Sequence, residues 1–94
     1  MPEVFSYNLP VTILKEGDYF VAYSPALDLS SAGKSEPEAK RMFSEAVSVL
    51  FEELLEMGTL DKVLNELGWK KIDHVYQPPQ VIDQSMMEVK VPAV

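Results

Sequence analysis

The stretch from Glu36 to Met57 constrains the fold most, because it carries the signals of a long helix at both ends. Ser35 is a favourable N-cap residue, and Glu38 stands three residues later, which completes a capping box. Pro37 falls in the first turn, where a missing N–H group costs little. No glycine and no other proline follows before Gly58, a typical C-cap residue. The sequence therefore predicts one helix of about 20 residues.

The apolar side chains of this helix occupy an arc that one covering surface cannot bury. The arc spans about 240°, whereas a surface helix with one buried side has a stripe of roughly 100°. Besides one face of a sheet, either the C-terminal third of the chain or a second subunit must cover it. The apolar residues are Ala39, Phe43, Ala46, Leu50, Leu54 and Met57 in the centre, Met42 and Val49 on one flank, and Val47 and Phe51 on the other. The remaining strip, either a solvated face or a partner-binding ridge, carries Glu38, Arg41, Glu45, Glu52 and Glu56.

The first third of the chain has the alternation of half-buried strands. Apolar and polar residues alternate over residues 5–14, where Pro10 places the start of the strand at an edge or after a bulge. A charged turn at residues 15–18 separates this segment from residues 19–23, which are rich in β-formers, and together they predict a hairpin. A short third strand is expected over residues 27–33.

The last third of the chain predicts a second helix and a final strand. Thr59 is the expected cap of a short helix that ends at Gly68. Residues 72–76 are expected to be extended, before Pro78 and Pro79 begin an exposed connection. Apolar and charged residues alternate again over residues 86–91, which predicts a strand.

These elements predict an α+β fold in a single domain of residues 1–94. Its sheet would begin as a three-stranded antiparallel meander, with the long helix packed on one face. Because crossovers between parallel strands are right-handed, the last strand is expected beside the first and parallel to it. The order is then β-β-β-α-β, with an extra short helix before the last strand.

Composition excludes several kinds of site. The chain has no cysteine, which rules out a disulfide framework, a thiolate zinc site and a cysteine nucleophile. It has one histidine, His74. The net charge of −7 disfavours nucleic acid and suits a basic partner. No apolar run could span a membrane, and the N-terminus lacks the regions of a signal peptide. We expect a soluble cytoplasmic protein without a metal or another cofactor.

Catalysis is not expected from the residues present. A metal-dependent nuclease, the most distant alternative, needs carboxylates that converge on two metal ions. Residues 11–14 supply none, and Asp18 and Asp28 fall in a turn and in the third strand. His74 and Asp73 would point to opposite faces of an extended segment, so they form no evident acid–base pair.

The segment from Glu16 to Asp28, with sequence EGDYFVAYSPALD, resembles the HicB antitoxin family. The resemblance continues through Ser31, Gly33, Ser35, Glu38-Ala39 and Glu45-Ala46, and covers about Val11 to Val91. It implies a truncated ribonuclease-H-like fold of β-β-β-α-β order. It also implies an antitoxin that binds and neutralises HicA, a small basic toxin of double-stranded-RNA-binding fold that cleaves messenger RNA.

The sequence departs from the usual HicB pattern in one respect. Full HicB antitoxins carry a C-terminal ribbon-helix-helix or helix-turn-helix domain that binds the operator, whereas this sequence stops at Val94. Operator binding is therefore not expected.

Two sets of binding residues follow from this interpretation. The expected contacts with a HicA-type toxin are Asp18, Tyr23, Asp28, Glu38, Glu45 and Glu52. The alternative is a stand-alone homo-oligomer without a toxin, and both can hold together. We expect a dimer or a higher even oligomer that shares the helix face or the last strand across a two-fold axis. Its expected interface residues are Val47, Phe51, Trp69, Val89 and Val91.

Overall fold

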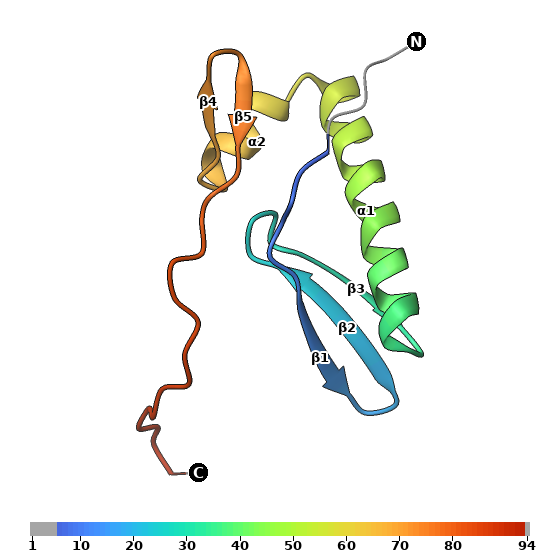
Figure 1. The fold of residues 1–94 in the computed structure, drawn as a ribbon, viewed down its shortest axis with the longest axis vertical. Coiled ribbons are helices and arrows are strands. Elements are labelled where there is room, and N and C mark those ends of the chain that lie inside the picture. Colours follow the sequence, from blue (N-terminus) through green and yellow to red (C-terminus); the bar gives the residue numbers. More distant parts are fainter. Residues whose placement is uncertain (1–5, 94) are drawn as a thin grey trace.

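The computed structural model of the chain describes residues 6–93 and shows an α+β fold (Figure 1). A three-stranded antiparallel sheet carries a long helix on one face, and a short helix and a two-stranded hairpin lie at one end of the body. Phe5, expected at the start of the first strand, lies outside the described residues. The elements are β1 Thr12–Glu16, β2 Tyr19–Ser24, β3 Leu29–Gly33, α1 Glu36–Met57, α2 Leu60–Glu66, β4 Lys70–Ile72 and β5 Val75–Gln77.

The three strands form the predicted antiparallel meander in the order β1-β2-β3. The first strand begins only at Thr12, two residues after Pro10. Gly17 and Asp18 form the two-residue loop between β1 and β2, and Gly17 has a φ of +59°. A positive φ at the first loop position is what a type II′ hairpin requires, and glycine adopts it without steric cost.

Helix α1 begins and ends as predicted. The Glu38 N–H donates to Ser35 Oγ at 3.2 Å, and the Lys34 N–H donates to Glu38 Oε1 at 3.3 Å. Gly58 ends the helix in the left-handed region, with a φ of +68°. Local capping signals therefore determine both ends of the helix.

Two hydrophobic clusters hold α1 against the rest of the chain. One is centred on the buried Ala22, Ala39 and Phe43, where α1 packs on the sheet. The other is centred on residues from the β2–β3 connection and from the C-terminal third, including the buried Trp69. Val47 packs against both clusters and joins them.

The C-terminal third covers one flank of the wide apolar arc of α1, as expected. The flank with Phe51 packs against Trp69, whose indole Nε1–H donates to the carbonyl oxygen of Ala26 at 2.7 Å. The other flank stays open, since Met42 is 37% and Val49 51% exposed.

Residues 70–77 form the hairpin β4–β5 instead of the single extended stretch expected over residues 72–76. Asp73 and His74 form its two-residue loop, with φ values of +50° and +67°. Positive φ at both central positions is the conformation of a type I′ turn. Thr59 occupies the N-cap position of α2, but its side chain makes no capping hydrogen bond.

The predicted fourth strand parallel to β1 is wrong. Residues 78–93, named here the C-terminal tail, contain no helix or strand, and in Figure 1 they descend on the β1 side of the picture, apart from the sheet. The alternation over residues 86–91 is real, but alternation does not specify which strand a segment pairs with. Because residues 59–77 cover the flank of α1, the tail leaves the body at β5, and the half-buried Pro78 and Pro79 favour an extended exit.

Candidate functional site

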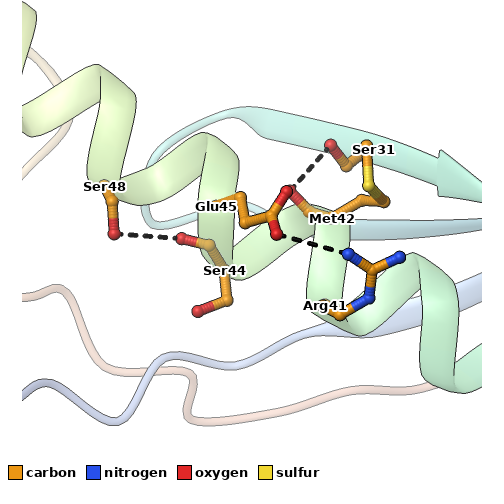
Figure 2. A network of polar contacts seen from close by, with 6 residues as sticks. All are labelled: Ser31, Arg41, Met42, Ser44, Glu45 and Ser48. Carbon is orange, nitrogen blue, oxygen red and sulfur yellow. Dashed lines mark hydrogen bonds and ion pairs between the residues drawn. The ribbon is translucent and has the colours of Figure 1, made fainter.

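The strand register divides the side chains of the sheet between two faces. Ala22 and Ser24 point towards α1 and are fully buried. Ser31 lies on the same face, since its hydroxyl donates to the backbone oxygen of Met42 in α1 at 3.3 Å (Figure 2). Because neighbouring residues of a strand point to opposite faces, the remaining side chains point away from α1. This outer sheet face consists of Thr12, Leu14, Glu16, Tyr19, Val21, Tyr23, Ser30 and Ala32.

The centre of the outer sheet face is apolar and aromatic. Leu14 pairs with Val21, which pairs with Ala32, so these three form one row across the strands. Leu14 is 47% and Tyr19 50% exposed. Within the described strands no lysine or arginine lies on this face, since Lys15 points to the other side and its Nζ lies 5.5 Å from the Phe20 ring centroid.

Carboxylates stand at both ends of this face. Asp18 lies in the turn before β2, and Asp28 lies in the connection after β2, where its φ of +48° suits an aspartate. The Tyr23 hydroxyl donates to Asp28 Oδ1 at 3.0 Å, and this hydrogen bond raises the pKa of Tyr23 above its usual value. The length of β2, about 20 Å at 3.3 Å per residue, separates the two turns, so Asp18 and Asp28 cannot share a metal ion.

The other three expected toxin contacts lie on α1. Glu38 takes part in the helix cap, and Glu45 Oε1 lies 3.3 Å from Arg41 Nη1 (Figure 2). Glu52 is exposed one further heptad along the helix. Glu45 and Glu52 are exposed on the side of α1 away from the sheet, whereas the side chain of Glu38 lies beside Gly33 of β3. The six expected contacts therefore do not share one surface. Tyr23 lies on the outer sheet face, with Asp18 and Asp28 at its two ends, and a small partner docked there would not touch Glu45 or Glu52.

The five expected interface residues also separate. Trp69 is 2% exposed and lies in the core of its own chain, between the rings of Tyr7 and Phe51. Val47 and Phe51 are half-buried against the same core. Val89 and Val91 lie in the C-terminal tail and are 70% and 76% exposed.

A groove of about 470 Å³ lies between the N-terminal segment, α1 and the hairpin β4–β5. Its walls include Leu9, Phe51, Leu55 and Tyr76, with His74 at the exposed hairpin turn. Because Asp73 and His74 are both turn residues, the expected opposite orientation in a strand does not apply to them.

The hydroxyl of Tyr76 beside this groove donates to the carboxylate of Asp61, and this bond raises the pKa of Tyr76 to about 12. Lys71 Nζ lies 4.0 Å from the same carboxylate and 5.4 Å from the Tyr76 ring centroid. These contacts fasten β4 and β5 to α2.

The described residues offer neither a cluster of metal ligands nor a membrane-spanning helix. Among residues 6–93, no three of His, Cys, Asp and Glu stand close enough together to hold a metal ion. Neither helix in the same range is long and apolar enough to cross a membrane.

Comparison with known proteins gave no match to a protein-family model, to a curated protein or to a solved structure.

Sequence reasoning found the carboxylates and Tyr23 of the outer sheet face, but missed its apolar centre. The missing signal was the hairpin register, which places Leu14 beside Val21.

Proposed function

We propose that this chain is an antitoxin-type binding protein of the HicB kind, which neutralises a small basic messenger-RNA-cleaving toxin by covering its surface. The observation that carries the proposal is the outer sheet face. It is an exposed apolar and aromatic centre with carboxylates at both ends and no basic side chain among its described residues.

The chemistry of this face suits a protein partner with lysine and arginine at its surface. Large apolar and tyrosine side chains at the centre of an interface supply most of its affinity. Carboxylates around that centre pair with basic groups and disfavour acidic or nucleic-acid partners. The basic surface that a toxin uses to hold RNA has this complementary chemistry.

The acidic strip of α1 then has a different role from that expected. Together with the net charge of −7, it attracts a basic partner at a distance and raises the rate of association. Direct contact falls to Asp18, Tyr23 and Asp28 on the outer sheet face. A cytoplasmic location, where messenger RNA is translated, belongs to this proposal.

The test is titration of a purified HicA-type toxin with the full chain, with RNA cleavage and calorimetric affinity as readouts. The double variant Asp18→Asn and Asp28→Asn removes two charges from the outer sheet face, and asparagine tolerates the positive φ of residue 28. The matched control, Glu45→Gln with Glu52→Gln, removes two charges from α1.

We expect the first pair to weaken binding at least about 10-fold, mainly through faster dissociation. The control pair should slow association only, and its effect should disappear as salt is added. Full inhibition of the toxin by the outer-face variant, with unchanged affinity, would refute the proposed surface. A toxin that does not bind the native chain at all would refute the antitoxin role.

A second candidate is a stand-alone homo-oligomer without a toxin, either a dimer or a higher even oligomer. The uncovered flank of α1 favours it, because Met42, Val49 and Met57 leave an apolar strip exposed. Light scattering at micromolar concentration tests this candidate, and a monomer would contradict it.

A further inference from the structure

We propose that residues 81–91 of the C-terminal tail exchange between two copies of the chain, each tail pairing as an added strand on the open edge of β1 in the other copy. This inference concerns assembly and goes beyond the proposed function.

The tail has the side-chain pattern of a half-buried strand but pairs with no strand among residues 6–93. Met87, Val89 and Val91 alternate with Glu88 and Lys90. The three apolar side chains are at least 70% exposed, and the segment is in neither a helix nor a strand. An apolar row on one side of an extended segment is what a sheet edge can bury.

The first strand supplies such an edge. Among residues 6–93, β1 pairs only with β2, so its other edge presents free backbone N–H and C=O groups. Proteins protect such edges with proline or with several charges. Here Lys15 and Glu16 stand only at the end of the strand, while Leu14 is 47% and the preceding Val11 39% exposed.

The tail does not pair with the sheet of residues 6–93, although it is long enough to reach another copy. Pro78 and Pro79 are half-buried where the tail leaves β5, and the tail then descends apart from the sheet, on the β1 side of the picture (Figure 1). Residues 80–91 span about 40 Å when fully extended, and the molecule with its tail is 52 Å long. A projecting arm of this length reaches across a two-fold axis, and reciprocal exchange gives a closed dimer.

The surface involved is sufficient for a stable dimer. An extended chain exposes about 1.45 Å² per dalton, so residues 81–91 expose roughly 1,800 Å². If half of the surface of each of the two tails is buried, roughly 1,800 Å² is removed from water. The sheet surface that the tails cover adds to this area. Stable interfaces bury about 1,200–2,000 Å² in total.

Charge is compatible with one orientation of the added strand. Placing Val89 on the side of Leu14 extends the apolar row of the outer sheet face by one strand. If the tail is antiparallel to β1 with Val89 opposite Leu14, Glu88 stands opposite Lys15, where the opposite charges attract, and Lys90 stands opposite Ile13.

Cross-linking tests the exchange directly, because the native chain has no cysteine. Full-length chains with Leu14→Cys or Val89→Cys, carrying tags of different size, are mixed and treated with a short bis-maleimide. We expect a cross-linked product that contains both tags. Replacing Leu14→Cys by Glu52→Cys, on the outer side of α1, should abolish that product.

Light scattering supplies the second measurement. Val89→Pro removes a backbone donor from the added strand, and Val89 has no packed contact whose loss could unfold the body. We expect a native dimer, a monomeric Val89→Pro variant and, because Gln80 lies outside the exchanged segment, a dimeric Gln80→Pro control. A native monomer, open polymers, a dimeric Val89→Pro variant or failure to cross-link would each overturn the exchange. A native monomer that still inhibits a toxin would leave the proposed function intact.

Discussion

Replacing Trp69 by phenylalanine tests whether the C-terminal third is fastened to the body as the structure indicates. The indole is 2% exposed, and its Nε1–H donates to Ala26, which lies 43 residues earlier in the chain. Phenylalanine keeps an aromatic ring against Tyr7 and Phe51 but has no hydrogen-bond donor.

The expected loss of unfolding free energy has two parts. Leaving the buried carbonyl of Ala26 without its donor costs about 1–3 kcal/mol. The smaller ring removes apolar contacts and leaves a cavity, which adds about 1 kcal/mol, well below the roughly 3–5 kcal/mol of a full Trp→Ala truncation. The sum is about 2–4 kcal/mol, out of a total stability of roughly 5–14 kcal/mol for a chain of this length.

Urea denaturation followed by far-ultraviolet circular dichroism measures this loss without relying on the fluorescence of the replaced tryptophan. At about 4–8 °C per kcal/mol, the melting temperature should fall by roughly 8–30 °C. Tyr19→Phe is the control, because Tyr19 is half exposed and its change should stay within about 0.5 kcal/mol. A loss below about 1 kcal/mol for Trp69→Phe would refute the buried, hydrogen-bonded indole.

Three further predictions concern single positions. Gly33→Ala should lower the free energy of unfolding by about 1–3 kcal/mol through overpacking, since a Cβ there would lie 2.6 Å from a backbone nitrogen of α1. The control Gly17→Ala, in open space but at positive φ, should lower it by about 1–2 kcal/mol. Equal stability of Gly33→Ala and the native chain in urea would contradict the contact. Tyrosinate absorbance should show one group with a pKa of about 12, absent in Tyr76→Phe. Because this folded pKa lies above the ordinary tyrosine value of 10.0, the native free energy of unfolding should fall as the pH rises from about 10 to about 12. A shared pKa near 10 for all tyrosines would contradict the bond to Asp61. His74→Gly should leave the chain equally stable or up to about 1 kcal/mol more stable in thermal melts, because glycine adopts the left-handed conformation freely. A clear loss of stability would mean that the imidazole makes a stabilising contact.

The long helix could be predicted because its signals are local. Ser35, Glu38 and Gly58 act within a few residues of the helix ends, so no knowledge of the rest of the fold is needed. The first hairpin was predictable for the same reason, since Gly17 fits a two-residue turn.

The fourth strand could not be predicted, because pairing depends on where the chain is held in space. Alternation over residues 86–91 describes a strand-like surface and leaves its partner open. The hairpin β4–β5 was missed because Asp73-His74 is an unusual pair for a type I′ turn, where Asn-Gly or Asp-Gly is common. That hairpin, fixed by Trp69, decides where the tail begins.

The candidate site shows the same division between local and distant determinants. The carboxylates and Tyr23 came from a motif within residues 16–28. Tyr23 lies on the outer sheet face and bonds Asp28, and Asp18 lies in the turn at the other end of β2. Glu45 and Glu52 have the same charge and lie on the opposite side of the molecule, because α1 covers the other face. Sequence separates acidic from basic residues, but register and layering decide which carboxylates one partner can reach.

The open edge of the sheet and its open outer face have one physical cause. The wide apolar arc of α1 needs more cover than three strands provide, and the chain uses residues 59–77 to bury the flank at Phe51. Those residues are then not available to extend or cover the sheet, so within the described part of the chain β1 keeps a free edge and Leu14 stays exposed. Binding on the outer face and strand exchange at the edge both bury surface that the packing of α1 leaves in water, and both can take place in one assembly, because they use different sides of β1.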